Sequence, residues 1–246
     1  VLNRVYSRFH GLSFGLGAVK ISLREASPQN SMKFLNSKPI FLVVSAPSGG
    51  GKTTVCNELL AANSGLQRAI TCTTRAPRTG EVNGKDYYFL SQEEFGARRA
   101  AGEFIEWANV YGNLYGTLKS EIITRLEAGS DVIVSVDVQG VESISRLAAE
   151  DPVLGPSLVS FFIALPSLES LQERLRKRAT DSEEVIQRRL ETARAEMRSC
   201  RGFDYILLSG SIEEDYRRAQ AIFWAEKMKR SRVSPAELER FIASFG

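Results

Sequence analysis

The chain has 246 residues, of which 43% are apolar and 25% are charged, and its formal net charge is +3. These values are typical of a folded globular protein, and so small a charge argues against the clustered basic surface that nucleic-acid binding usually requires. The single histidine, His10, and three widely spaced cysteines give no basis for a Ser-His-Asp or Cys-His site, a histidine-ligated metal or a CxxC zinc site. We therefore expect any chemistry to use carboxylates, lysine, arginine, backbone groups and a hard metal ion.

The cysteine spacing and the hydropathy also bear on the cellular setting. No apolar run reaches the roughly 18 residues that a membrane-spanning helix needs, and the best candidate, residues 40–46, has the length of a strand. Cys56, Cys72 and Cys200 are too scattered for a disulfide framework, which fits a reducing compartment. The sequence therefore predicts a cytoplasmic protein without a membrane or nucleic-acid partner.

Residues 1–37 differ from the rest of the chain. They carry several basic residues against a single acid, Glu25, and are rich in serine and glycine. Such a stretch is typical of a targeting segment, but it is also consistent with a disordered extension or with Met32 as the true start. We favour the second interpretation, because the strand pattern begins just after Met32.

Apolar runs alternate with helical patterns from residue 38 onward. The runs at 39–45, 131–137, 158–165 and 204–208 are typical of parallel strands buried on both faces. The segments 55–62, 118–128, 168–177 and 182–197 have helical spacing. This alternation predicts an α/β fold with a parallel sheet covered by helices on both sides.

Two further segments stand apart from that alternation. Residues 71–117 are rich in threonine, glycine, tyrosine and charge, and we interpret them as a small β-rich insertion over the mouth of the sheet. The C-terminal part is predicted to be helical over 212–230 and again from Ser234, where Ser234, Pro235 and Glu237 form the pattern of a capping box with proline in the first turn. The apolar residues of this last helix share one face, and they are Leu238, Phe241, Ile242 and Phe245.

A glycine-rich loop joins the first strand to the first helix. Backbone N–H groups of such a loop can bind phosphate oxygens, and the N-terminus of the following helix adds partial positive charge. Lys52 is placed to bind the β- and γ-phosphates, and the Thr53 hydroxyl to bind Mg²⁺. The GxxxxGK[ST] pattern is complete except for Ala46 at its first position, and the alternative is a simple glycine turn. The predicted ATP-binding residues are Ala46, Pro47, Ser48, Gly49, Gly50, Gly51, Lys52, Thr53 and Thr54.

A second group of polar residues follows in the insertion. Arg75 and Arg78 lie three residues apart and can converge on one phosphate through paired N–H donors. Tyr87 can add an O–H donor, and Glu81 can orient an arginine. Glu106 is the natural partner for guanine, whose N1–H and N2 amino groups are adjacent donors that adenine does not offer.

These motifs together resemble the guanylate kinase family, and the match extends from about Ile40 to Lys229. The resemblance implies a P-loop NTPase sheet with a GMP-binding insertion (71–117) and a helical lid (168–197). It implies that GMP is bound by Thr71, Arg75, Arg78, Glu81, Tyr87, Glu106, Tyr115, Thr117 and Asp137. It implies that the catalytic residues around the ATP phosphates are Lys52, Arg174, Arg178 and Arg189.

The expected reaction is transfer of a phosphoryl group from ATP to GMP with Mg²⁺, by a monomer or homodimer. The expected organisation is an extension (1–37), the catalytic domain (38–230) and a C-terminal helix (231–246). Two alternatives are a non-catalytic peptide-binding module of the same family and a kinase for another nucleoside monophosphate. The intact loop argues against the first, and the carboxylates Glu106 and Asp137 argue against AMP. The sequence departs from the usual family pattern at Ser135, Ala179 and Ser209-Gly210.

Overall fold

The computed structural model describes residues 35–47, 49–110, 112–177 and 182–246. The two interpretations of the N-terminal extension and the predicted roles of Ser48 and Arg178 therefore lie outside the described residues. The same is true of the departure at Ala179.

The centre of the fold is a five-stranded parallel sheet in the order β2-β7-β1-β8-β9. The strands are β1 (Phe41–Ser45), β2 (Leu66–Arg68), β7 (Asp131–Ser135), β8 (Leu158–Ala164) and β9 (Tyr205–Leu208). The four predicted strands are confirmed with shifts of a few residues at their ends. Strand β2 was not predicted, because it has three residues, lies at the edge and buries only Leu66.

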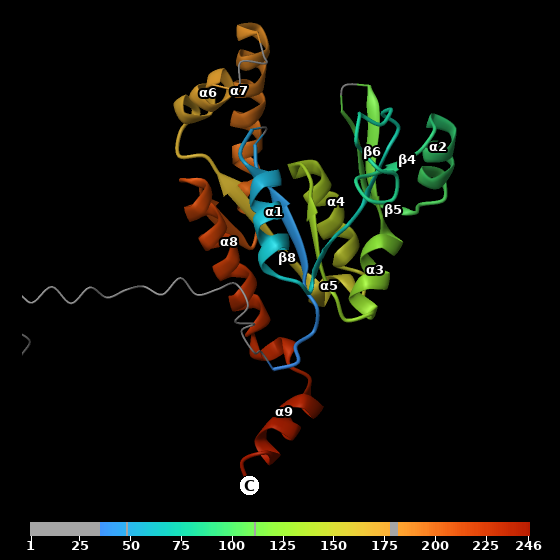
Figure 1. The fold of residues 1–246 in the computed structure, drawn as a ribbon, viewed down its shortest axis with the longest axis vertical. Helices are drawn as coiled ribbons and strands as arrows, with labels where there is room; N and C mark the ends of the chain where they lie inside the picture. The colour runs from blue at the N-terminus through green and yellow to red at the C-terminus, as the bar shows by residue number, and fades with distance from the viewer. Residues whose placement is uncertain (1–34, 48, 111, 178–181) are drawn as a thin grey trace, which may run out of the picture. The chain divides into compact units, whose positions relative to one another are not determined.

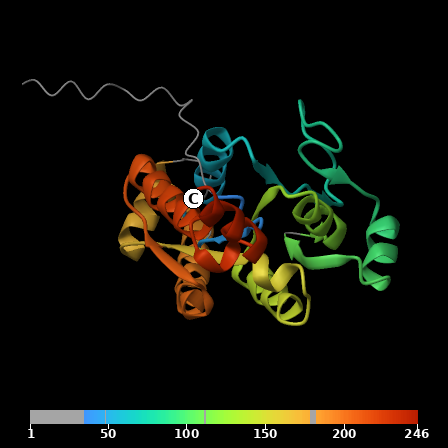
Figure 2. The same cartoon turned by 90° about the horizontal axis from the view of Figure 1, so that it is seen from below.

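Alternating side chains of β1 divide the core into two layers. Leu42 and Val44 face one layer, and Phe41 and Val43 face the other. The first layer is covered by α1 (Lys52–Ala62) and α8 (Ile212–Lys227), and the second by α3 (Lys119–Glu127) and α4 (Val138–Ala148). Figures 1 and 2 show these helix pairs on opposite sides of the sheet, as the alternation of strands and helices predicts.

Residues 71–118 form a second sheet in the order β4-β3-β6-β5. It consists of β3 (Thr71–Thr73), β4 (Tyr88–Phe89), β5 (Phe104–Val110) and β6 (Asn113–Leu118), together with helix α2 (Gln92–Ala100). The sheet has a small core of its own, formed by Cys72, Phe95, Phe104 and Leu118. Its β5 contacts α4 and its β6 contacts α3, so it lies on the α3 and α4 side of the main sheet (Figure 1).

A helical pair follows β8. Helices α6 (Leu168–Lys177) and α7 (Glu183–Arg198) pack through Leu171, Leu175, Ile186 and Ala193, and a short 3-10 helix, η1 (Ser199–Gly202), leads into β9. The helix α5 (Leu154–Ser157) precedes β8.

The C-terminal segment contains η2 (Arg230–Arg232) and α9 (Pro235–Ala243). Ser234 caps α9 by accepting from the Glu237 N–H, with proline in the first turn as expected. The predicted capping box forms only in part, because the Glu237 carboxylate accepts from the Asn36 N–H at 3.4 Å and pairs with Arg240. Helix α8 ends at Lys227 and so is shorter than predicted. Within the described ranges, no helix is long and apolar enough to cross a membrane.

Candidate active site

Some of the predicted site residues lie at one edge of the main sheet, and the others lie in the second sheet and its loop. Because the strands are parallel, their C-terminal ends reach the same edge, which is where ligands bind in open α/β sheets. The glycine-rich loop follows β1, Asp137 follows β7, helix α6 follows β8, and Ser209 follows β9 (Figure 1). The topology therefore joins four segments that are far apart in the sequence.

The loop between β1 and α1 requires its glycines. Gly49 and Gly51 have φ values of +86° and +97°, which side chains rarely adopt. A Cβ on Gly50 would lie 2.9 Å from both the Cβ of Ala46 and the carbonyl oxygen of Pro47. Gly50 N–H donates to that carbonyl at 2.8 Å and closes the turn. The Gly50 N–H is therefore used inside the turn and does not point toward a phosphate. The glycine-rich sequence alone suggested phosphate binding by the N–H groups of this loop.

The start of α1 is suited to an anion. The N-cap residue is Gly51, which has no side chain to satisfy the first N–H groups of the helix, so they can bind a phosphate. Lys52 Nζ donates to the Ala46 carbonyl oxygen at 2.5 Å, so the lysine folds back over the loop. Burial lowers the pKa of Lys52, and the negative charges of Glu196 and Asp137 oppose that effect. Thr53 lies exposed in the first turn.

Five residues predicted to form the site of the acceptor phosphate lie in the second sheet and its loop. Arg75 Nη2 donates to both carboxylate oxygens of Glu81, at 2.9 and 3.0 Å. The Arg75 guanidinium lies 5.4 Å from the ring centre of Tyr87, and the rings of Tyr87 and Tyr115 are 6.2 Å apart. The hydrogen bond from Arg75 lowers the pKa of Glu81. Arg78 contributes its backbone N–H to Glu81 at 2.7 Å, while its side chain is exposed.

Two of the residues predicted to bind guanine, Glu106 and Thr117, are buried, and the other two, Thr71 and Asp137, are half-buried. Glu106 is 8% exposed, and its Oε1 accepts from the hydroxyl of the fully buried Thr117 at 2.7 Å. Asp137 caps α4 by accepting from the Gly140 N–H at 2.8 Å. A Cβ on Gly140 would lie 3.4 Å from Glu106 Oε2, so the first turn of α4 approaches that carboxylate closely. Thr71 lies opposite Thr117 in the pairing of β3 with β6.

Burial changes the acidity of this cluster. Burial raises the pKa of Glu106 to about 7, the Thr117 hydrogen bond acts in the opposite direction, and the nearby charge of Asp137 raises the value further. A carboxylate held this way favours a ligand that offers hydrogen-bond donors, since such donors stabilise its charged form.

The helical pair places Arg174 at the same edge. Its Nη1 and Nη2 donate to Ser209 Oγ at 3.2 and 3.1 Å. A Cβ on Gly49 would lie 3.3 Å from side-chain carbons of both Leu171 and Leu175, so α6 lies against the glycine-rich loop. Arg189 is half-buried on α7.

Two neighbouring arginines have the role expected of exposed helix residues. Arg176 pairs with Glu183, and Arg188 pairs with Glu184, all with side chains more than half exposed. Both arginines therefore pair with exposed glutamates of α7.

The whole of this edge lies within a recognised family domain. A family model described as guanylate kinase matches residues 37–226, which is more than half of the chain. The chain belongs to the guanylate kinase family. Two curated guanylate kinases illustrate the similarity. The protein of Carboxydothermus hydrogenoformans is 41% identical over 197 residues, which cover 80% of this chain and 93% of that protein. The protein of Rhodopseudomonas palustris (strain HaA2) is 40% identical over 202 residues, 82% of this chain and 89% of that protein.

A solved guanylate kinase has the same fold. The crystal structure of guanylate kinase from Anaplasma phagocytophilum superposes with a TM-score of 0.62 at 34% identity, covering 81% of this chain and 92% of that chain. The family resemblance drawn from the sequence and the P-loop α/β fold are both confirmed.

Sequence reasoning did not identify two carboxylates that connect segments around the candidate site. Asp215 accepts from Ser209 Oγ and from the Gly210 N–H at the turn between β9 and α8. Glu121 accepts from the Ile70 N–H at 3.0 Å and from the Tyr88 hydroxyl at 2.8 Å, which connects α3 to the second sheet. Neither carries a motif signal, because their roles depend on contacts between distant segments.

Proposed function

We propose that this guanylate kinase family member transfers the terminal phosphoryl group of ATP to GMP, giving ADP and GDP. The observation that carries the proposal is the buried Glu106 beside Thr117 and Asp137, in the same chain as an intact phosphate loop. Guanine offers adjacent N1–H and N2 donors to such a carboxylate. Adenine would leave buried acceptors unpaired, and unpaired buried groups discriminate strongly between ligands.

The acceptor phosphate is held by the residues around Glu81. Arg75 and Arg78 offer planar guanidinium donors, and Tyr87 and Tyr115 offer hydroxyl donors. Glu81 holds Arg75 through two hydrogen bonds, which orients the guanidinium before the substrate arrives. The phosphate oxygen of GMP is already ionised at neutral pH, so the attack requires no general base. The protein therefore acts by positioning the two phosphates and neutralising charge.

The donor is bound by the loop at residues 46–54. The uncapped start of α1 binds phosphate oxygens, and Lys52 exchanges its contact with the Ala46 carbonyl for the β- and γ-phosphates. Arg174, Arg178 and Arg189 offset the charge that develops on the transferred group. Closure of α6 and α7 over the substrates excludes water and limits wasteful hydrolysis of ATP.

Magnesium fits this site only with help from the nucleotide. In the described part of the chain, no three carboxylate, histidine or cysteine side chains are grouped to hold a metal ion. Mg²⁺ commonly binds through one or two protein oxygens together with substrate phosphates. The exposed Thr53 hydroxyl in the first turn of α1 supplies such an oxygen. When bound, the ion neutralises charge on the phosphates.

Ser135 makes the magnesium requirement testable. It lies at the end of β7 opposite Val44, where relatives usually carry a carboxylate. We expect Ser135→Asp to lower the Mg²⁺ concentration that gives half-maximal turnover by about tenfold, because a hard cation prefers a charged oxygen ligand. Titration of Mg²⁺ at fixed ATP measures this, and identical curves for the two proteins would remove the idea.

The organisation and setting follow from the same proposal. The catalytic domain spans 38–230, with the GMP-binding insertion at 71–117 and the lid at 168–197, and residues 231–246 add a C-terminal helix. Cys56 and Cys72 are buried free thiols, and Cys200 is also a free thiol, which supports a reducing compartment such as the cytoplasm. The partners are ATP and GMP, without nucleic acid or membrane, in a monomer or homodimer.

The direct test of the loop is Lys52→Met. We expect it to abolish turnover of ATP with GMP while GMP binding, measured by calorimetry, stays within about twofold, because Lys52 contacts only the donor phosphates. Lys38→Met is the matched control, since Lys38 is exposed ahead of β1. Unimpaired turnover in Lys52→Met would remove the loop from the mechanism.

A further inference from the structure

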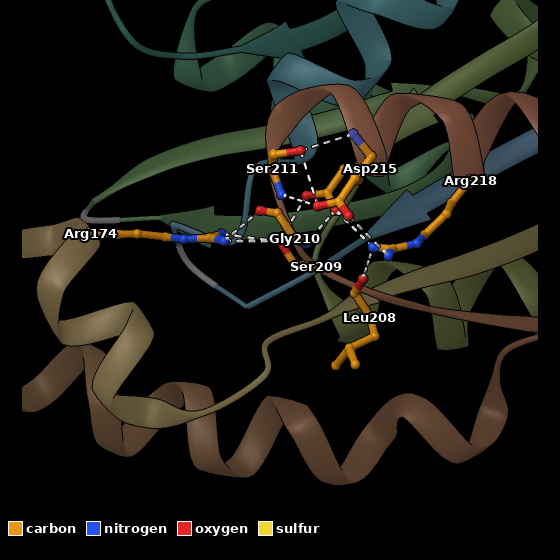
Figure 3. Close-up of polar contacts among 8 residues, drawn as sticks. Arg174, Leu208, Ser209, Gly210, Ser211, Asp215 and Arg218 are labelled. Atoms are coloured by element: carbon orange, nitrogen blue, oxygen red, sulfur yellow. Dashed lines mark hydrogen bonds and ion pairs between the residues drawn. The ribbon is translucent and has the colours of Figure 1, made fainter. Parts of the chain in front are cut away.

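A buried hydrogen-bonded pair lies where β9 ends. Ser209 and Asp215 are 4% and 5% exposed, and Ser209 Oγ lies 2.8 Å from Asp215 Oδ2. The other carboxylate oxygen, Oδ1, accepts from the Gly210 N–H at 2.7 Å. Both oxygens of Asp215 therefore bind the turn between β9 and α8 (Figure 3).

The direction of the hydrogen bond between this pair is fixed by chemistry. A carboxylate only accepts hydrogen bonds, whereas a serine hydroxyl has one proton and two lone pairs. The Ser209 proton must therefore point toward Asp215. The lone pairs of Ser209 are then left to accept from other groups.

Arg174 donates hydrogen bonds to the Ser209 oxygen from the side opposite Asp215. Its Nη1 and Nη2 both donate to Ser209 Oγ, at 3.2 and 3.1 Å, and Nη2 also donates to the Gly210 carbonyl oxygen at 3.2 Å. Figure 3 shows Arg174 and Asp215 on opposite sides of Ser209. A guanidinium has five N–H donors, so these contacts still allow it a second ligand.

Helix α6, which carries Arg174, lies against the phosphate loop. Leu171 and Leu175 lie one turn apart on α6 and approach Gly49 of the loop, and Arg174 lies between them in the sequence. The contact with Ser209 thus fixes the guanidinium at the edge of the sheet where the loop begins. A misplacement of about 1 Å at such a site can lower a rate about 100-fold.

We propose that Asp215 is a positioning residue for Arg174 in phosphoryl transfer, and that it acts through the orientation of the Ser209 hydroxyl. The inference rests on the proposed function, because it gives Arg174 a role at the ATP phosphates. It adds Ser209 and Asp215 as residues that affect the reaction only through the position of Arg174.

The turn has other supports that should keep it folded without the Asp215 charge. Arg218 Nη1 donates to the Leu208 carbonyl oxygen at 2.6 Å and also lies 3.8 Å from Asp215 Oδ1, while Arg218 Nη2 pairs with Glu214. Ser211 and Glu214 form a capping box at the start of α8. A change at Asp215 that keeps its shape is therefore expected to alter the Arg174 contact before it alters the fold.

Asp215→Asn provides that change. The amide keeps an oxygen for the Gly210 N–H but presents its NH₂ group to Ser209. The Ser209 proton must then turn toward Arg174, so that the hydroxyl O–H and the guanidinium N–H, both donors, face each other. We expect kcat at saturating substrates to fall about 10- to 100-fold, with the KM for GMP unchanged. Ser209→Ala should have a similar effect. Glu213→Gln is the matched control, because Glu213 is an exposed acid in the same helical turn that pairs with Arg217.

A double-mutant cycle separates positioning from stability. Arg174→Ala should itself lower kcat, and adding Asp215→Asn in that background should lower it no further. The inference is overturned if Asp215→Asn leaves kcat unchanged, if it lowers kcat equally in both backgrounds, or if Arg174→Ala has no effect. If the wild type turns over GMP and Asp215→Asn has the same kcat, only this inference is refuted. A folded wild type without turnover of GMP would refute the proposed function as well.

Discussion

Glu106 is the residue on which the proposed recognition of guanine most depends. Burial and the nearby charge of Asp137 raise its pKa to about 7, against the opposing effect of its hydrogen bond from Thr117. A protonated carboxyl cannot accept from both N1–H and N2 of guanine, because one oxygen then carries a proton. The proposed role of Glu106 therefore links binding of GMP to the ionisation of this carboxyl group.

This linkage predicts a pH dependence near neutrality. Because the pKa of Glu106 is about 7, its ionised fraction falls as the pH drops below 7, approaching about tenfold per pH unit. The KM for GMP should therefore rise as the pH falls from 8 to 6. Initial rates over a range of GMP concentrations at each pH measure this change.

Glu106→Gln is the control for that profile. Glutamine has a similar size but does not titrate, so the variant should bind GMP weakly and lose the step near pH 7, while any step from the phosphate of GMP itself remains. An unchanged profile in the variant would assign the titration to another group.

Residue-level prediction was most specific where a motif fixes the position. Lys52 lies at the start of α1 as the loop pattern expects, and Glu81 contacts an arginine, Arg75, as expected. The binding roles of these residues stay predictions. The pKa of Glu106 and the role of Asp215 could not be predicted, because both depend on burial between segments that are distant in the sequence.

At the scale of elements, the contact between α6 and the glycine-rich loop is the most testable. Gly49 and Gly51 both have positive φ, but only Gly49 has lid side chains close to the position of a Cβ, at 3.3 Å from Leu171 and Leu175. The two glycines thus share a left-handed backbone, which glycine adopts freely, and differ in their contact with α6.

Alanine at each glycine separates these effects. Gly51→Ala should lower the free energy of unfolding by about 1–2 kcal/mol through the left-handed backbone alone. Gly49→Ala should lower it further, because the leucines of α6 must also shift. Thermal or urea unfolding measures both variants. Equal losses would mean that α6 does not rest on the loop in solution.

Elements were predicted best where their pattern was long and apolar. Strands β1, β7, β8 and β9 were recognised because they are buried runs. Helix α4 was not, because its sequence contains glycine, serine and valine, which have low helix propensity, and its apolar face is stabilised by packing against the sheet. Helix α2 was missed inside a segment interpreted as β-rich, although Ser91 and Glu94 form a capping box at its start.

At the scale of the molecule, a buried ion pair joins the C-terminal segment to the domain. Arg232 donates to the Glu226 carboxylate at 3.0 Å and to the Pro156 carbonyl oxygen at 3.0 Å. The side chains of Arg232 and Glu226 are 8% and 1% exposed. The Arg232 carbonyl oxygen accepts from the Lys38 N–H at 2.8 Å, so this segment also holds the start of β1. Arg232 lies beyond residue 226, where the family match ends.

Removal of this arginine should therefore destabilise the whole domain. Arg232→Met leaves Glu226 buried without its main partner, and such changes cost roughly 3–5 kcal/mol. We expect the low end of that range, because Lys229 and Tyr205 also bind Glu226.

Two variants control that measurement by thermal unfolding. Arg230→Met changes an exposed arginine of the same short helix and should have little effect. Adding Glu226→Gln to Arg232→Met should recover part of the loss, because the buried charge is then removed. A wild-type midpoint for Arg232→Met would show that the segment does not stabilise the domain.

The central claim is that the chain phosphorylates GMP because a buried carboxylate selects guanine. The most direct measurement is coupled ADP release from ATP and Mg²⁺ with GMP, dGMP, AMP, CMP and UMP as acceptors. Selection of guanine by Glu106 predicts the highest rate of ADP release with GMP, the next highest with dGMP, and much lower rates with AMP, CMP and UMP. Turnover of AMP at a rate matching GMP would contradict the role of Glu106, and a folded protein with no turnover of any acceptor would contradict the assignment of catalysis.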